Sequence, residues 1–307
     1  MNENEAVLVT YGLQRAYGSC MALDGASMMV RRGDVYGLVG RNGAGKTTLM
    51  RMVTGQSEPS GGEMELFGAS GKDMRSQRSR TGAMIETPSF APFLSARENL
   101  EYYRLQRGIP GKNVVDEVLE QVDLTGAGKK KFKSFSLGMK QRLGLALALM
   151  NHPDLLILDE PINGLDPEGA EFRQILRTLN QERQTTILIS SHILSELSNV
   201  ATRYGFMEKG KLLEEISAAT LHDKCRTCLR LEVDDPAKAA AVLQSVLGTD
   251  RFEVLPGGII QLYDYLDDPK QASYALTQNG VALLAMEQKG ADLEAYFLSL
   301  IGGGRDA

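Results

Sequence analysis

The chain has 307 residues, and its 34 Lys and Arg residues against 39 Asp and Glu residues give a formal net charge of −5. Apolar residues make up 43% and charged residues 24% of the chain, a balance that is typical of globular proteins and argues against a disordered chain. The acidic balance argues against a general nucleic-acid binder, and three cysteines are too few for a disulfide scaffold and suit a reducing compartment.

The N-terminal segment and the longest apolar run both argue against insertion into a membrane. Residues 1–9 are acidic and lack the apolar stretch of a signal peptide. The longest apolar run, Leu143 to Met150, is far shorter than the roughly 18–20 residues that a membrane span needs. We therefore expect any action at a membrane to take place from outside the bilayer.

The first two thirds of the chain alternate strands with helices. In chain order we expect strands within residues 7–40, a glycine-rich loop and helix over 40–55, turns and short strands over 56–86, mostly helix over 95–150, a buried strand over 155–160, a helix over 168–182 and a buried strand over 185–192. Because strands that alternate with helices form parallel sheets, the sequence predicts an α/β domain.

The pattern changes after about residue 220. The expected order is strand 227–233, helix 236–248, strand 251–255, strand 259–263, helix 268–280, strand 281–287 and helix 291–302. The first six of these elements have the order of a split βαβ, ferredoxin-like unit. We predict a first domain over residues 1–220, with a helical subdomain at about 87–150, and a small α+β accessory domain over 221–307.

A glycine-rich segment between a predicted strand and a predicted helix fits the phosphate-loop pattern G-x-x-x-x-G-K-[ST]. It consists of Gly40, Arg41, Asn42, Gly43, Ala44, Gly45, Lys46 and Thr47, followed by Thr48. The glycines let backbone N–H groups surround phosphates at the start of a helix. Lys46 is expected to reach the β- and γ-phosphates and Thr47 to bind Mg²⁺. The other interpretation is a plain glycine-rich turn, which the strand and helix on either side make much weaker.

Two carboxylates follow the buried strand that begins at Leu155. Successive side chains of a strand point to opposite faces, so Asp159 and Glu160 are expected to have different roles. We assign Asp159 to the Mg²⁺ shell and Glu160 to polarising the attacking water. An acidic helix cap is the alternative for this stretch taken alone.

A third motif precedes the apolar run at Leu143. In residues 134–142, Ser136 is suited to cap the following helix, and Gly138 allows a ligand to approach the backbone. A phosphate could bind at this helix start. An ordinary capped amphipathic helix explains the stretch equally well in isolation.

Together these motifs resemble those of the ATP-binding subunit of ABC (ATP-binding-cassette) transporters. The segments GRNGAGKTT, SFSLGMKQR, LLILDEP, NGLD and SSH occur in the family's order, within residues 5–215. The resemblance implies a P-loop NTPase fold of the ABC type, with a helical subdomain. It also implies an ATPase that binds ATP and Mg²⁺.

Further site residues are implied by this resemblance. It makes Glu160 and His192 catalytic, with His192 beside the γ-phosphate, and it places Tyr17 against the adenine. It assigns to a signature loop, which contacts ATP bound by a partner subunit, the residues Ser136, Leu137, Gly138 and Met139. It assigns to a D-loop between subunits the residues Asn163, Gly164, Leu165 and Asp166.

Some positions depart from the common family pattern. Glu86 stands where Gln is common, and we expect it to join Thr47 and Asp159 around Mg²⁺, directly or through water. Arg41 stands where Pro is frequent, and Leu137 and Met139 stand where Gly and Gln are common. This combination resembles the subgroup of bacitracin-resistance and lantibiotic-immunity exporters.

The implied function is that of a motor for efflux. Two ATP-binding subunits, of the same chain or of two different chains, would enclose ATP between them and drive a transmembrane permease on a separate chain. The protein would be cytoplasmic and bound peripherally to the inner face of the cell membrane. The alternative is a soluble ABC-type ATPase that acts as a non-transport clamp or as a regulator.

Three smaller features have less specific meanings. His222, Cys225 and Cys228 have zinc-like spacing but no evident fourth ligand, so we expect ordinary cysteines. The basic run Lys129 to Lys133 is interpreted as a solvated loop, or less readily as a lipid contact. The segment from Thr87 to Gly108 is where the family receives the permease, although its aromatic residues also suit a helical core.

Overall fold

The computed structural model describes residues 5–86, 89–127, 129–165, 168–289 and 293–302. The chain divides into two compact units, Met1–Ala218 and Ala219–Ala307, whereas the sequence analysis places the division after residue 220. In the part of the chain that the structure describes, no helix combines the length and the apolar character needed to cross a membrane.

The first unit is built on a six-stranded sheet with the spatial order β10-β9-β3-β8-β7-β6. Its strands are β3 (Val35–Gly40), β6 (Thr81–Met84), β7 (Leu155–Leu158), β8 (Thr186–Ser191), β9 (Arg203–Glu208) and β10 (Lys211–Ser217). All neighbours are parallel except β10, which pairs antiparallel with β9. Every residue of β3, β7 and β8 is buried, as is typical of central parallel strands. The parallel sheet predicted from the alternating pattern is therefore present.

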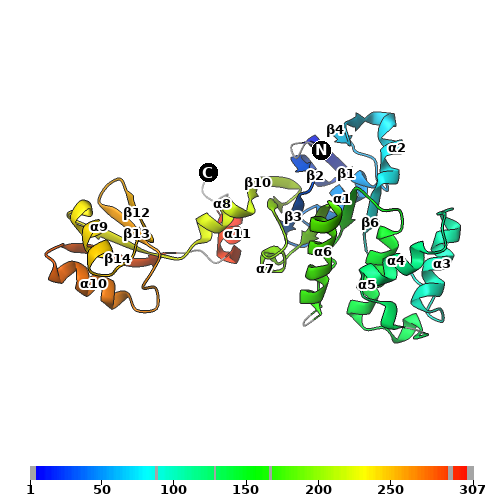
Figure 1. The fold of residues 1–307 in the computed structure, drawn as a ribbon. Helices are drawn as coiled ribbons and strands as arrows, with labels where there is room; N and C mark the ends of the chain where they lie inside the picture. Colours follow the sequence, from blue (N-terminus) through cyan, green and yellow to red (C-terminus); the bar gives the residue numbers. More distant parts are fainter. Residues whose placement is uncertain (1–4, 87–88, 128, 166–167, 290–292, 303–307) are drawn as a thin grey trace. The chain divides into compact units, whose positions relative to one another are not determined.

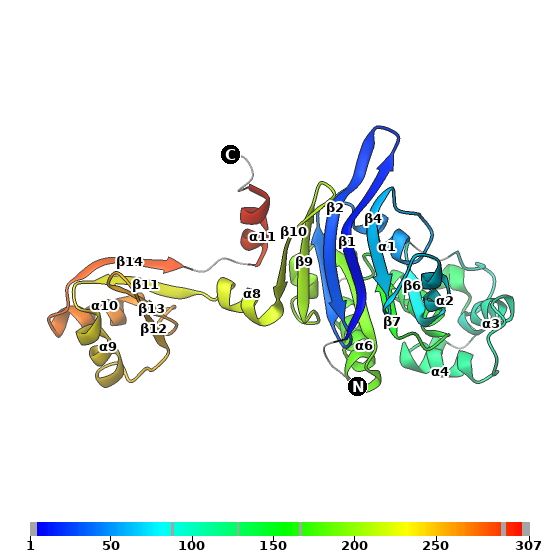
Figure 2. The ribbon, with the colours of Figure 1, turned by 90° about the horizontal axis from the view of Figure 1, so that it is seen from above.

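A second, antiparallel sheet in this unit has the order β2-β1-β4-β5. It contains β1 (Ala6–Tyr17), β2 (Cys20–Arg31), β4 (Gly61–Leu66) and β5 (Ala69–Ser70). The long β1 and β2 form a hairpin (Figure 2). Helix α1 (Lys46–Val53) contributes buried side chains to one core cluster that it shares with strands of both sheets. This packing holds the start of α1 in place at the end of β3.

Helices complete the first unit. They are α2 (Met74–Gln77), α3 (Ala96–Gln106), α4 (Val114–Gln121), α5 (Leu137–Leu149), α6 (Gly169–Arg183) and α7 (Leu194–Leu197). Figure 1 shows α3, α4 and α5 grouped together, in the region predicted to be helical. Helix α3 begins with a capping box in which Ser95 and Glu98 satisfy each other's backbone N–H groups.

The second unit has a sheet with the order β12-β13-β11-β14, and helices α9 and α10 contribute to its core. Its elements are α8 (Ala218–Cys225), β11 (Cys228–Val233), α9 (Pro236–Ser245), β12 (Phe252–Leu255), β13 (Ile259–Leu262), α10 (Pro269–Gln278), β14 (Leu283–Lys289) and α11 (Leu293–Gly302). All neighbouring strands are antiparallel. From β11 to β14 the order is β-α-β-β-α-β, that of a ferredoxin-like unit. Side chains of α9, α10 and the sheet form a separate core.

Candidate functional site

Three parallel strands of the first unit end at one edge of the six-stranded sheet. The end of β3 leads into the glycine-rich loop, β7 leads into Asp159 and Glu160, and β8 leads into His192. In open α/β sheets, ligands bind outside the carboxyl ends of the strands. The glycine-rich loop, the pair Asp159 and Glu160, and His192 therefore meet at the edge where this fold places its ligand.

Strand β2 packs closely against the glycine-rich loop. Gly45 has φ +107°, and a Cβ at this position would lie 2.6 Å from the carbonyl oxygen of Ala22, so only glycine fits without strain. Gly45 is also the N-cap of α1, and no side chain caps the helix there. The N–H groups at the start of α1 are thus free of a side-chain acceptor and suited to an anion.

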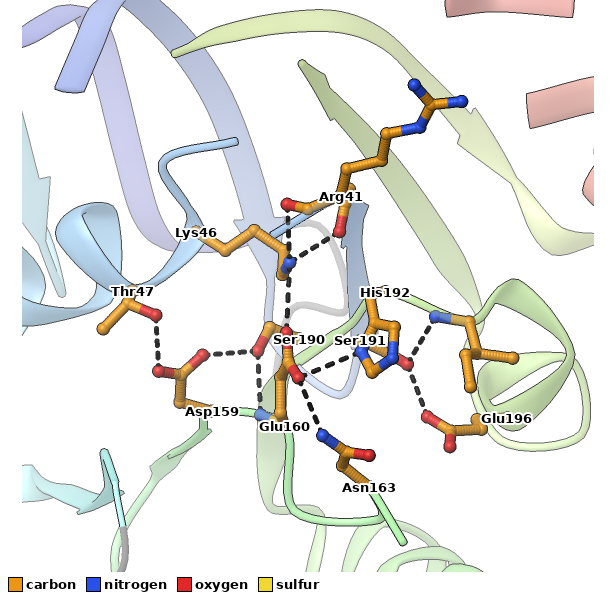
Figure 3. A network of polar contacts seen from close by, with 12 residues as sticks. Arg41, Lys46, Thr47, Asp159, Glu160, Asn163, Ser190, Ser191, His192 and Glu196 are labelled. Carbon is orange, nitrogen blue, oxygen red and sulfur yellow. Dashed lines mark hydrogen bonds and ion pairs between the residues drawn. The ribbon is translucent and has the colours of Figure 1, made fainter. Parts of the chain in front are cut away.

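Lys46 is 4% exposed and lies within the loop. Its Nζ donates to the carbonyl oxygens of Gly40, at 2.5 Å, and Arg41, at 3.2 Å, and lies 3.2 Å from Glu160 Oε1. Figure 3 shows the Arg41 side chain directed away from this cluster. The ammonium group is therefore positioned among the loop carbonyls, with a carboxylate as its counter-ion.

Thr47 and Asp159 are joined by a hydrogen bond. Thr47 Oγ1 donates to Asp159 Oδ2 at 2.7 Å, and Ser190 Oγ donates to Asp159 Oδ1 at 2.6 Å. The backbone N–H of Glu160 in turn donates to Ser190 Oγ at 2.9 Å (Figure 3). Ser190 thereby links the two acidic positions. Its role was not predicted from the sequence, although Ser190 is the first serine of the S-S-H segment.

The Glu160 carboxylate contacts Lys46 of the glycine-rich loop, His192 after β8, and Asn163. Its Oε1 faces Lys46, whereas its Oε2 lies 3.0 Å from His192 Nδ1 and accepts a hydrogen bond from Asn163 Nδ2 at 3.3 Å. Glu160 has φ +46°, a left-handed conformation that is uncommon for a residue with a side chain and is frequent at functional sites. The side chains of Asp159 and Glu160 have separate partners, but both residues follow the end of β7, so alternation along the strand does not place them.

A cavity of about 540 Å³ lies against the loop. It is lined by Tyr17, Cys20, Met21, Ala22, Asn42, Gly43, Ala44, Gly45, Lys46, Thr47, Thr48, Glu160 and Lys209. The Tyr17 ring is 45% exposed, with the Arg15 guanidinium 4.6 Å from its centroid. Its hydroxyl is 3.4 Å from Ser57 Oγ, and this hydrogen bond, with a smaller effect of Arg15, lowers the pKa of Tyr17. An exposed aromatic ring therefore lines the same cavity as the phosphate loop.

Glu86 lies just beyond the end of β6. The backbone N–H of Asp159 donates to the carbonyl oxygen of Met84, which lies two residues before Glu86. The Glu86 carboxylate forms an ion pair with Arg51, which lies one helical turn after Thr47 on α1. Its predicted contact with Mg²⁺ stays a prediction. As the structure stands, the partner of Glu86 is Arg51.

The signature loop lies at the start of α5. Ser136 is the N-cap, and its Oγ accepts from the Met139 N–H at 3.2 Å. Leu137 is 47% exposed, whereas Gly138 is buried. Within the described ranges, Ser136 to Met139 make no hydrogen bond to the phosphate-loop cluster. The loop is thus not part of that hydrogen-bond network, and its residues Ser136 and Leu137 are exposed.

The remaining predicted residues differ in exposure, and some lie outside the described residues. In the D-loop, Asn163 and Gly164 are exposed and Leu165 is buried, while Asp166 lies outside the described residues. In the segment from Thr87 to Gly108, Thr87 and Pro88 lie outside them too.

The aromatic residues of the segment from Thr87 to Gly108 divide between core and surface. Phe90 is buried against Tyr103, with ring centroids 5.7 Å apart. Phe93 is 71% exposed, beneath Lys133 of the basic run. No group of His, Cys, Asp and Glu that could hold a metal occurs in the described ranges, which include His222, Cys225 and Cys228.

Comparisons with known proteins agree with this geometry. The family model described as ABC transporter matches residues 23–163. The bacitracin transport ATP-binding protein BcrA of Bacillus licheniformis is 43% identical over 300 residues, covering 97% of this chain and 98% of that protein. The lantibiotic transport ATP-binding protein SrtF of Streptococcus pyogenes is 41% identical over 212 residues, covering 68% and 90%.

A solved structure shows the same fold. The ABC transporter component cbiO1 of Clostridium perfringens has a TM-score of 0.65 and 24% identity, covering 72% of this chain and 92% of that chain. The identity to BcrA extends over nearly the whole of both chains. The protein therefore belongs to the ATP-binding subunits of ABC transporters and is an ATPase.

Proposed function

We propose that the protein powers the export of a peptide antibiotic, or of a related small molecule, through a permease on a separate chain. The match to the bacitracin transport protein carries this proposal, because it covers both units and not the ATPase unit alone. Arg41, Glu86 and the signature loop also resemble those of bacitracin and lantibiotic exporters. Relatives named as transport proteins give no support to a non-transport clamp.

Thr47 and Asp159 fit a magnesium ion. Octahedral ligands at 2.0–2.1 Å from Mg²⁺ lie about 2.9 Å from each other when adjacent. Thr47 Oγ1 and Asp159 Oδ2 are 2.7 Å apart, so a small movement admits the ion between them. Bound there beside the phosphates, Mg²⁺ would neutralise charge that develops during phosphoryl transfer.

Lys46 and Glu160 are expected to separate when ATP binds. The γ-phosphate offers Lys46 a stronger partner than Glu160, since it carries more charge. Glu160 Oε1 is then free to accept a proton from the attacking water, and His192 and Asn163 hold Oε2 in place. We assign the role of base to Glu160 and that of orienting the γ-phosphate to His192, with the Tyr17 ring against the adenine.

ATP hydrolysis is proposed to require two subunits. The signature loop makes no hydrogen bond to the phosphate loop of its own chain in the described ranges, and we propose that a second subunit, identical or different, brings the two together. A two-fold arrangement joins each phosphate loop to the signature loop of the partner. The exposed Phe93 lies in the segment that we propose to receive the permease, at the inner face of the cell membrane.

Affinity capture tests this function. The full-length chain is captured from gently solubilised native membranes, and the proteins that accompany it are identified. We expect a polytopic membrane protein in stoichiometric amount. If the chain stays in the soluble fraction and captures ribosomes, nucleic acid or nothing, the transport proposal is wrong and the clamp is favoured.

The substrate is tested by resistance. Cells that express the chain with its captured permease are challenged with bacitracin and, separately, with a lantibiotic. We expect resistance to one of these peptides, and its loss with Glu160→Gln. Equal sensitivity with and without an active chain contradicts the proposed substrate class.

A further inference from the structure

Glu168 contacts the signature loop of its own chain. It is the N-cap residue of α6, and both of its carboxylate oxygens lie near Ser136 Oγ, at 3.2 and 3.4 Å. A Cβ built on Gly138 would lie 1.7 Å from Glu168 Oε2. The carboxylate therefore packs directly against the backbone of the first turn of α5, in space that only glycine leaves open.

The hydroxyl of Ser136 has one proton to donate. Its oxygen already accepts a hydrogen bond from the Met139 N–H, and its proton is directed to Glu168. Ser136 is exposed, so a group from another subunit can reach it. Any second acceptor that needs this proton has to displace the Glu168 carboxylate first.

The Glu168 carboxylate is not neutralised by a cation among the residues that the structure describes. In the described part of the chain, Glu168 forms no ion pair, and the first turn of α5 contains no acidic residue of its own. The start of a helix of 13 residues attracts anions through its unpaired N–H groups. Glu168 thus supplies, from another element, the negative charge that the start of α5 attracts.

We propose that Glu168 occupies the position that the γ-phosphate of the partner's ATP takes when the two subunits close. The inference rests on the proposed function, in which Ser136 and Gly138 receive that phosphate. A carboxylate and a phosphate cannot share the Ser136 proton, and their charges repel. Glu168 is therefore a positioning residue that acts through Ser136 and raises the ATP concentration needed for closure.

Displacement of Glu168 would affect the catalytic base, Glu160, through the D-loop. Glu168 follows Asn163 by five positions in the sequence, and Asn163 donates to Glu160 Oε2. The D-loop also lies beside the signature loop, since a Cβ at Gly164 would be 3.4 Å from Leu137 Cδ2. Arrival of the partner's ATP at Ser136 would in this way be sensed at Glu160.

The test measures dimer formation by the full-length chain against ATP concentration, using light scattering. The background is Glu160→Gln, which we expect to bind ATP and to hydrolyse it far more slowly than the wild type. In this background, Glu168→Gln removes the charge and keeps the shape. We expect it to lower the ATP concentration for half-maximal dimerisation roughly three- to tenfold, since a screened charge has a severalfold effect and the dimer has two such sites.

Three comparisons isolate the effect. Glu182→Gln removes a charge near the other end of α6, where the residue is exposed, and is expected to change nothing. ATP affinity of the dilute monomer is expected to be the same in all variants, which a general structural effect would not give. Glu168→Asp, which keeps the charge on a shorter side chain, is expected to fall between wild-type Glu168 and Glu168→Gln.

The outcomes separate the two proposals. If the Glu160→Gln parent dimerises with ATP and Glu168→Gln leaves its ATP dependence unchanged or weakens dimerisation, the role of Glu168 is wrong and the proposed function stands. If the parent binds ATP but never dimerises, the two-subunit mechanism fails, and the inference about Glu168 fails with it.

Discussion

Glu160 is the residue on which the site converges, because Lys46, Asn163 and His192 all contact its carboxylate. Glu160→Gln keeps the size of the side chain but removes the base. We expect ATP binding to persist, the dimer to be trapped, and hydrolysis to fall roughly 10²- to 10⁴-fold, the usual contribution of a general base. Nucleotide affinity and phosphate release are measured on the same sample. Turnover at the wild-type rate would show that Glu160 is not the base.

Arg51 competes with Mg²⁺ for Glu86, if Glu86 is a ligand as predicted. Arg51→Gln frees the Glu86 carboxylate and removes a positive charge one turn from Thr47. Both effects favour a cation, so the Mg²⁺ concentration for half-maximal hydrolysis should fall severalfold, an effect in the range of one exposed ion pair. Arg51→Lys keeps the charge and serves as the control. An unchanged Mg²⁺ dependence argues that Glu86 remains outside the metal shell.

The motif residues of the site were predictable because each motif is short and continuous in sequence. Ser190, Arg51 and Glu168 were missed, since their roles come from contacts between distant segments. Ser190 is fully buried between two carboxylate positions 30 residues or more away. Its only sequence signal is its place at the end of an apolar strand, beside the predicted His192.

At the scale of elements, the start of α3 carries a pH-dependent contribution to stability. Glu98 accepts a hydrogen bond from the Ser95 backbone N–H and one from Lys131, and these hold its pKa at about 2, against an ordinary value of 4.5. Because the pKa of Glu98 is lower in the folded state, the stabilisation that its ionised carboxylate gives is fully present above pH 4.5. The contribution is lost as the pH falls from 4.5 toward 2.

Glu98→Gln removes this dependence. We expect weaker hydrogen-exchange protection of α3 than in the wild type at pH 6, with the difference shrinking as the pH falls below 4.5. Wild type and variant are compared at matched pH, which cancels the intrinsic exchange rate. Glu120→Gln, an exposed change on α4, is the control. A difference that stays constant with pH would contradict the capping role.

Sequence periodicity predicted the parallel sheet, the helical region and the order of elements after residue 220. It missed the hairpin of β9 and β10 and the full length of β1 and β2. In β1 and β2, bulges interrupt the alternation of buried and exposed residues, so no strict period of two extends along them. The position of β3 between β8 and β9 depends on pairing between distant strands, which no local pattern encodes.

At the scale of the whole molecule, each of the two units has a core of its own. Leu231 is fully buried in the core of the second unit and Leu188 in that of the first. We expect Leu231→Ala to cost about 2–5 kcal/mol in the second unit, and Leu188→Ala a similar amount in the first. The two variants therefore form a matched pair for deciding whether the cores unfold separately.

Calorimetry of the full chain measures this, with and without ATP. ATP binds at the first unit and should raise only the transition that Leu188→Ala lowers. Leu231→Ala should lower the other transition and leave the ATP-induced shift intact. A single transition that both variants lower and ATP raises would mean that the units unfold together. In that case the second unit contributes stability to the nucleotide site. The extension of the match to the bacitracin transport relative over the second unit would then have a structural reason as well as a functional one.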